Sequence, residues 1–191
     1  MANINILIPK ILKWAGGFVN DPIDPGGATN KDITINTFRA FRMLNKLPMP
    51  SIDDLKNISD QEWASVLKTF FWDKWMADQI NNQSIADILV DWFWASGAWA
   101  VIIPQRLLNV PSDGIVGNGT LIALNSKLPS EIFQQIFDAR IKFINDIVAK
   151  SISDYEKKIG RASTPDEQLK YTLKKFQIGW FNRLNDFKFE A

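Results

Sequence analysis

Apolar residues recur at helical spacing along almost the whole chain, and no other feature of the sequence constrains the fold as strongly. Near the start, Ile4, Leu7, Ile8 and Ile11 follow the pattern of one helix face. This first helix is expected to end at about residue 15, before two consecutive glycines. The same pattern predicts further helices over residues 35–46, 51–57, 60–76, 83–109, 120–125, 131–149, 151–158 and 165–185.

Local signals set several of these helix boundaries. Four hydroxyl side chains stand where they can cap a first helical turn: Ser51, Ser59, Ser130 and Thr164. The last of them is followed by Pro165 and Glu167, which completes a capping box with proline at the first helical position. Within residues 83–109, breaks are expected near Gly97 and Pro104.

One segment departs from the helical pattern. Residues 18–34 are crowded with Asn, Asp, Pro and Gly, which favour tight turns. Three short pieces in it can form β-structure, namely Phe18-Val19, Ala28-Thr29 and Ile33-Thr34. The sequence therefore predicts a mainly α protein with one small β-hairpin near the N-terminus.

Composition narrows the chemistry that the chain can perform. Among its 191 residues there is no Cys and no His, which excludes thiol nucleophiles, disulfides, zinc sites with nitrogen or sulfur ligands and imidazole acids or bases. Any catalysis has to come from carboxylates, hydroxyls, Lys, Tyr or an oxygen-ligated metal. With 22 Lys and Arg against 21 Asp and Glu, the net charge of +1 is too balanced for capture of a nucleic-acid backbone. We expect no metal, no cofactor and no nucleic acid.

Neither a secretion signal nor a membrane span is expected. The opening residues, MANINILIPKILKW, have no basic region before their apolar residues and no small-residue cleavage site. The longest apolar-rich run, residues 88–103, contains Asp91 and is shorter than the roughly 20 residues that cross a bilayer.

Residues 13–34, KWAGGFVNDPIDPGGATNKDIT, carry the most distinctive motif. They resemble the signature of glycoside hydrolase family 108, the N-acetylmuramidases that cleave bacterial peptidoglycan, which reads approximately K-W-E-G-G-[YF]-x-x-[DN]-P-x-D-P-G-G-x-T-x-x-G-I-T. The chain departs from this pattern at Asp32, where the family usually has Gly, and at Ala15, where it has its catalytic Glu.

The resemblance continues into a small peptidoglycan-binding module that accompanies the family. Four stretches match it: Gln105-Arg106-Leu107-Leu108, Asp113-Gly114-Ile115-Val116-Gly117, Thr120-Leu121 and Gly179-Trp180-Phe181-Asn182-Arg183. The second stretch lacks the carboxylates of a calcium loop and is interpreted as a turn capped by its Asp. The resemblance implies a lysozyme-like domain over residues 1–90 and a helical peptidoglycan-binding part over 91–191, packed as one compact unit.

The family's site residues carry over onto the matching positions of this chain. Ala15 takes the place of the general acid, Asp24 would be the second carboxylate, and Thr29 would position the attacking water. The residues expected to bind substrate are Trp14, Gly16, Gly17, Phe18 and Asp21. The alternative is that both aspartates only form turns, since Asp-Pro and Pro-Gly-Gly need no chemistry to explain them.

Ala15 changes what the chain is expected to do. A methyl group donates no proton, and the loss of a general acid commonly lowers the rate ~10²–10⁴-fold. Three explanations stay open: replacement of a parental Glu by engineering, which we favour, a naturally inactive peptidoglycan binder, or an acid elsewhere with Ala15 as a good helix former.

The resemblance implies an enzyme that hydrolyses the β-1,4 bond between N-acetylmuramic acid and N-acetylglucosamine, here inactivated. The alternative is a non-catalytic cell-wall binding or secretion-associated protein. The expected partner is the glycan strand of peptidoglycan, with an immunity or inhibitor protein if the chain is an antibacterial effector, and a monomer is expected. Such a protein would be made in the bacterial cytoplasm and reach the periplasm or wall through a holin, as endolysins do, or by contact-dependent secretion.

Two groups of side chains have a structural and a functional interpretation. Six tryptophans, at positions 63, 72, 75, 92, 94 and 99, fit helix packing better than sugar stacking. Lys170, Lys174 and Lys175 have the spacing of a solvated helix face, and contact with anionic cell-wall polymers is the alternative.

Overall fold

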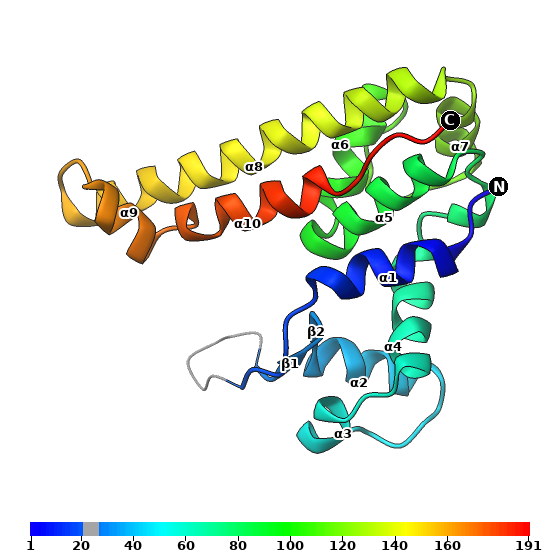
Figure 1. Ribbon diagram of the computed structural model, residues 1–191, viewed down its shortest axis with the longest axis horizontal. Helices are drawn as coiled ribbons and strands as arrows, with labels where there is room; N and C mark the ends of the chain where they lie inside the picture. The colour runs from blue at the N-terminus through cyan, green and yellow to red at the C-terminus, as the bar shows by residue number, and fades with distance from the viewer. Residues whose placement is uncertain (21–26) are drawn as a thin grey trace. The chain divides into compact units, whose positions relative to one another are not determined.

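The structure, a computed structural model, describes residues 1–20 and 27–191 (Figure 1). The chain divides into two compact units, Met1–Asn81 and Asn82–Ala191. Helices dominate both units, and within the described ranges the sheet consists of one two-stranded antiparallel hairpin in the first unit. The predicted fold class, mainly α with a small hairpin near the N-terminus, is confirmed.

The first unit contains the hairpin and several short helices. Its elements are α1 (Ile4–Trp14), β1 (Thr29–Asn30), β2 (Ile33–Thr34), α2 (Ile35–Leu44), α3 (Ile52–Lys56), α4 (Asp60–Leu67), a π-helical turn η1 (Lys68–Trp72) and a 3₁₀ turn η2 (Ala77–Gln79). The Ser51 and Ser59 side chains accept hydrogen bonds from the first turns of α3 and α4, as predicted.

The helix predicted over residues 60–76 is wrong beyond residue 67. In a continuous α-helix, nine residues correspond to two and a half turns, which would place Trp72 on the side opposite Trp63. The wider π turn, closed by the Asp73 N–H donating to the Lys68 carbonyl at 2.8 Å, rotates the chain back. Both indoles are consequently fully buried.

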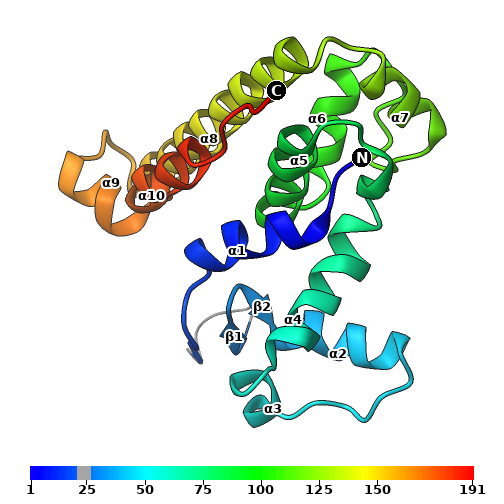
Figure 2. The same ribbon diagram turned by 45° about the vertical axis from the view of Figure 1, so that its right-hand side comes forward.

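The second unit consists of helices only, within the residues described. They are α5 (Gln83–Ser96), α6 (Trp99–Leu107), α7 (Asn118–Asn125), α8 (Pro129–Ile159), α9 (Pro165–Tyr171) and α10 (Lys174–Asn185). Figures 1 and 2 show α8 and α10 running side by side, with α9 joining their ends. The break at Gly97 is confirmed, since this residue ends α5 with a φ of 59°.

Three boundary predictions in this unit are wrong. The chain from residue 129 to 159 is one helix of 31 residues. Leu128 is its N-cap in place of the predicted Ser130, and the break predicted between residues 149 and 151 is absent, since Ser151 lies inside the helix. The Ser151 hydroxyl accepts the Leu173 N–H at 3.0 Å instead of capping a new helix.

The other two errors concern α6 and the last helix. Pro104 lies within α6 without breaking it, since the Leu108 N–H still donates to the Pro104 carbonyl at 3.0 Å. The predicted final helix divides at Thr172, which has an extended backbone. The hydroxyl of this buried residue donates to the Gln168 carbonyl and accepts the Lys174 N–H, and so ends α9 and begins α10.

A buried ion cluster joins three helices of the second unit. Asp91 on α5 is completely buried and accepts hydrogen bonds from Arg140 on α8 at 2.8 Å and from Arg183 on α10 at 2.6 Å. Burial lowers the pKa of Arg140, and the Asp91 charge opposes that change. None of the helices in the described ranges has the length and apolar character needed to cross a bilayer.

Candidate functional site

The site predicted from the sequence begins where the chain leaves α1. Ala15 ends this helix: its N–H donates to the Ile11 carbonyl at 3.1 Å, and its backbone turns to an extended conformation. Ala15 itself is partly exposed. A longer side chain at this position would therefore start from the end of a helix at the protein surface.

The two glycines after Ala15 are not required by backbone geometry or by packing. Neither has a left-handed φ, and a Cβ added to Gly16 or Gly17 would meet no atom of the described residues within 4 Å. Gly27 differs, because its φ of +68° favours glycine. The absence of side chains at positions 16 and 17 leaves open surface beside position 15.

Hydrogen bonds that involve the backbone and one carboxylate fix the hairpin against this helix end. The Lys31 N–H donates to the Gly16 carbonyl at 3.0 Å, and the Gly16 N–H donates to Asp32 Oδ1 at 3.3 Å. Val19 and Thr29 exchange two backbone hydrogen bonds of 2.8 Å, so the predicted piece Phe18-Val19 does join the hairpin. Thr29 is thereby paired with a residue only four positions after Ala15.

The turn between the two strands accounts for one departure from the family pattern. Lys31 and Asp32 both have positive φ, 47° and 63°, a conformation in which glycine is favoured and Asp is tolerated. Asp32 occupies the position of the family's Gly and adds the carboxylate that accepts the Gly16 N–H. This substitution therefore retains the turn and adds a contact to Gly16, just after the end of α1.

Side chains of the hairpin also tie it to the helices of the first unit. The buried Asn30 amide donates to the carbonyls of Leu55 and Lys56, both at 3.0 Å, at the end of α3. Trp63 on α4 donates its indole N–H to the Lys31 carbonyl at 3.0 Å. Sequence reasoning missed Asn30, although its place inside the motif was a signal for a specific role.

Alternation along the strands places Thr29 on the outer face of the hairpin. Thr29 pairs with Thr34, and Asn30 with Ile33. Since neighbouring residues of a strand point to opposite faces, the buried Asn30 and Ile33 define the inner face. Thr29 is partly exposed, and its hydroxyl donates to the Gly27 carbonyl at 3.3 Å, a long hydrogen bond.

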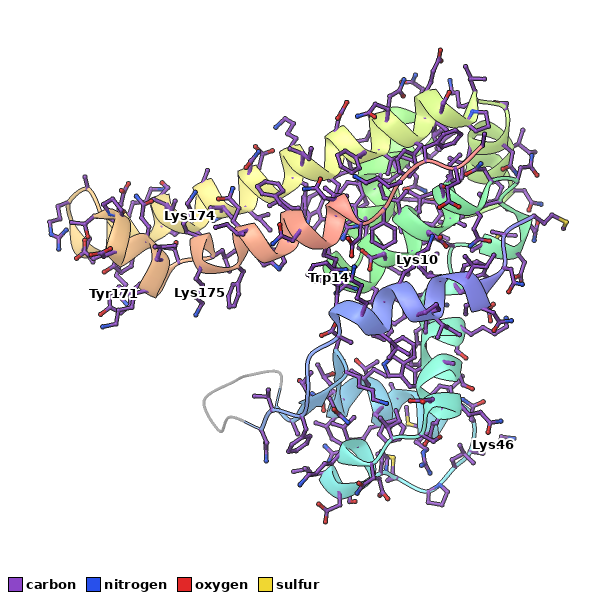
Figure 3. All side chains as sticks on the ribbon, viewed as in Figure 1. Lys10, Trp14, Lys46, Tyr171, Lys174 and Lys175 are labelled. Carbon is purple, nitrogen blue, oxygen red and sulfur yellow. The ribbon has the colours of Figure 1, made fainter. Side chains whose placement is uncertain are left out.

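Two partly exposed aromatic side chains flank Ala15 along the chain. The ammonium of Lys13 lies 5.4 Å from the Trp14 ring centroid, and that of Lys56 lies 5.6 Å from the Phe18 ring. Figure 3 shows Trp14 at the end of α1. Each ring thus sits beside a cation and keeps part of its surface accessible.

Asp21 and Asp24 lie outside the described residues, as does the rest of segment 21–26. The structure thus brings Ala15, Gly16 and Thr29 into one hydrogen-bonded substructure, and the roles of both aspartates stay predictions. Elsewhere in the described chain, no group of three or more Asp or Glu side chains could hold a metal ion.

The second motif forms a turn, as predicted. Asp113 Oδ1 accepts the Ile115 N–H at 2.9 Å, and Gly114 has a φ of +77°. The buried Gln105 side chain donates to Asp113 and to the Ile115 carbonyl and accepts the Gly114 N–H. The hydrogen bonds from Ile115 and then Gln105 lower the pKa of Asp113.

Four of the six tryptophans are buried, as the packing interpretation predicts, and two are not. Trp63, Trp72, Trp75 and Trp92 are fully buried, whereas Trp99 is 52% exposed and Trp94 is partly exposed. Sequence reasoning also missed the partners of Asp91. A single charge inside the apolar run 88–103 was the available signal, because a buried carboxylate needs a cation.

A helix end and a small hairpin in a mainly helical protein are the features of a lysozyme-like fold. Residues 8–97 match the family Glycosyl hydrolase 108, and residues 99–185 match the Predicted Peptidoglycan domain. The chain therefore belongs to glycosyl hydrolase family 108 and carries its peptidoglycan domain. By family it is a glycoside hydrolase of the lysozyme type, with peptidoglycan as its substrate or partner.

A solved structure supports the shared fold. The structure of Brucella abortus SagA is 23% identical in sequence and superposes with a TM-score of 0.69, covering 96% of this chain and 90% of that one. No curated protein matches the sequence.

Proposed function

We propose that this chain binds the glycan strands of peptidoglycan at the end of α1 and the hairpin, and cleaves them poorly or not at all. The parent reaction is hydrolysis of the β-1,4 bond between N-acetylmuramic acid and N-acetylglucosamine. One observation carries the proposal: Ala15 is a partly exposed residue at a helix end, beside two glycines with open space around them. A general acid at this position would have room to meet a sugar chain.

A carboxyl at position 15 would have the electrostatic setting that a general acid needs. The C-terminal end of a helix carries a partial negative charge, which disfavours the ionised carboxylate and raises its pKa. A raised pKa keeps the proton available at neutral pH for transfer to the leaving glycosidic oxygen as the bond to the anomeric carbon breaks. Alanine provides no such proton.

The remaining roles follow from the family motif and the hairpin. We assign Asp24 as the second carboxylate, which takes the proton from the attacking water as the water oxygen bonds to the anomeric carbon. Thr29 lies on the outer face of the hairpin, where its hydroxyl can exchange its long bond to Gly27 for one to that water. Trp14, Phe18 and Asp21 would contact the sugars.

The test compares the chain with Ala15→Glu and Ala15→Gln on purified peptidoglycan. We expect all three to sediment with the polymer, and only the Glu form to release muropeptides ending in reducing N-acetylmuramic acid. The rate of cleavage by the Glu form is expected to exceed that of the unchanged chain ~10²–10⁴-fold. The Gln form controls for the size of the new side chain.

Two results would contradict parts of the proposal. If the unchanged chain, with Ala15, cleaves peptidoglycan as fast as Ala15→Glu, the general acid lies elsewhere in the sequence. Binding by all forms without cleavage by any would favour the alternative, a non-catalytic wall-binding or secretion-associated protein. Export from the bacterial cytoplasm through a holin or a contact-dependent system is part of the same proposal and is tested by fractionation of expressing cells.

A further inference from the structure

Aromatic rings and lysines, all exposed except the partly exposed Lys174, gather where α9 meets α10 in the second unit. We call this the α9–α10 surface, formed by Lys170, Tyr171, Lys174, Lys175, Phe176 and Ile178. Tyr171 is 54% exposed, Phe176 47% and Ile178 72%. Figure 3 shows Tyr171 and Lys175 projecting from the same side of α9 and α10.

The lysines of this surface lie on rings and amides and form no ion pair with any described carboxylate. The Lys170 ammonium lies 5.1 Å from the Tyr171 ring centroid, and that of Lys175 lies 4.7 Å from the Phe176 ring. Lys174 donates to the Gln177 amide oxygen at 2.7 Å. All three ammonium groups can therefore bind an external anion.

The surrounding charge is positive. Residues 150–175 contain seven basic and four acidic side chains, a net charge of +3, against +1 for the whole chain. Three of the four acids are engaged: Asp154 pairs with Lys150, Glu156 accepts from Ser163, and Glu167 forms a bidentate pair with Arg161. Asp166, in the first turn of α9, is the fourth.

The surface is held in place by contacts beneath it. The rings of Tyr155 on α8 and Tyr171 stack with their centroids 5.5 Å apart, and those of Phe176 and Trp180 lie 5.8 Å apart. The Gln177 amide donates to Asn145 Oδ1 on α8 at 2.8 Å. The rings and lysines are thus presented from a fixed helical frame, which limits the conformational entropy lost when a ligand binds.

We propose that the α9–α10 surface binds the stem peptides of peptidoglycan through their carboxylates. These peptides combine carboxylates with the methyl groups of alanine. The surface combines exposed rings with ammonium groups that form no ion pair with a described carboxylate. The residues lie within the stretch that matches the peptidoglycan domain. The inference rests on the proposed function only in taking the wall polymer as the ligand, and it adds a second contact, to peptide instead of glycan.

The test uses intact peptidoglycan and peptidoglycan whose carboxylates have been amidated with a carbodiimide and ammonia. The protein is the full chain, and the readout is its affinity by sedimentation. We expect the parent to bind the intact polymer roughly tenfold more tightly than the amidated one, with the difference falling as salt is raised. The triple variant Lys170→Gln, Lys174→Gln, Lys175→Gln should bind both polymers at the lower affinity.

A matched control removes the same charge elsewhere. Lys127, Lys142 and Lys188 are exposed, and their triple Gln variant should keep the parent's preference for the intact polymer. For the rings, Tyr171→Ala with Phe176→Ala should weaken binding of the intact polymer severalfold. Ile122→Ala with Leu128→Ala, which removes exposed apolar side chains of α7 and the turn after it, should not.

The outcomes separate this inference from the proposed function. Equal binding of both polymers by the parent, or an unchanged preference in the first triple variant, would overturn the inference and leave glycan binding standing. No binding of either polymer would overturn both. Sedimentation of the parent with phosphatidylglycerol vesicles that is lost in the first triple variant, with peptidoglycan binding unchanged, would assign the surface to a membrane and overturn the inference.

Discussion

The hydrogen bonds that hold the functional region of the first unit differ in kind from those that hold the helices of the second. At the end of α1, the chain contributes only backbone groups to its contacts with the hairpin, to the Lys31 N–H and the Asp32 carboxylate, and residues 15–17 carry almost no side-chain atoms. Among α5, α8 and α10, the connection is made by buried charged side chains, Asp91 with Arg140 and Arg183. Because backbone groups make the contacts at the end of α1, a side chain placed there would be available for chemistry. In the buried cluster, the charged side chains themselves hold the helices together and are not available to a substrate.

The largest effect should come from breaking the buried cluster. Asp91→Ala leaves two arginines without their carboxylate in a region where Arg140 is almost inaccessible, so we expect a loss of about 3–5 kcal/mol in the free energy of unfolding. Urea denaturation measures it. Asp60→Ala removes an 82% exposed partner of Lys31 in the first unit and should cost less than about 1 kcal/mol. Similar costs for the two variants would refute the contrast.

A smaller loss is expected at the turn after α6. Gln105→Ala removes a buried amide that makes three hydrogen bonds and leaves the Gly114 N–H without its acceptor. The expected cost is about 2 kcal/mol, again by urea denaturation. Gln134→Ala, which removes an exposed amide that donates to Asp138, serves as the control and should be close to neutral. An unchanged free energy of unfolding in Gln105→Ala would show that the turn is stable without the Gln105 side chain.

The glycines beside Ala15 should separate stability from binding. Gly16→Ala and Gly17→Ala meet open space, so each should change the free energy of unfolding by less than about 0.5 kcal/mol while weakening sedimentation with peptidoglycan. Gly27→Ala forces alanine into a φ of +68° and should cost about 1 kcal/mol. Full wall binding by the first two variants would argue against a sugar site there.

The smallest effect on stability is expected from low pH, through Glu167 in the first turn of α9. Arg161 and then the Thr164 backbone lower the pKa of Glu167 from 4.5 to about 2. A depressed carboxyl pKa contributes stability that is present above pH 4.5 and is lost as the pH falls toward 2. An NMR titration should show this value, and Arg161→Gln should move it back toward 4.5. An unchanged pKa in that variant would exclude the arginine as its main cause.

Local signals in the sequence predicted the parts of the fold that local physics decides. The caps at Ser51, Ser59 and Thr164 and the hairpin pieces were found because each depends on a few adjacent residues. The π turn and the continuous α8 were missed, since burial of Trp72 and the engagement of Ser151 depend on distant neighbours.

The site shows the same division between local and distant contacts. The motif located Ala15 and Thr29 directly, and the structure then placed them on a helix end and a hairpin that hydrogen bonds connect. The motif did not reveal that Asn30 reaches residues 55 and 56, or that Arg183 in the last matching stretch pairs with a carboxylate 92 positions away. Pairings over such distances depend on tertiary packing, which one sequence does not contain.

The central claim is that position 15, and not simply a carboxylate near the hairpin, restores cleavage. The most direct measurement compares muropeptide release from purified peptidoglycan by Ala15→Glu and by Gly17→Glu, which adds the same group two residues further on in open space. The account predicts release of reducing-end N-acetylmuramic acid by the first variant alone. Equal release by both, or by neither, would contradict it.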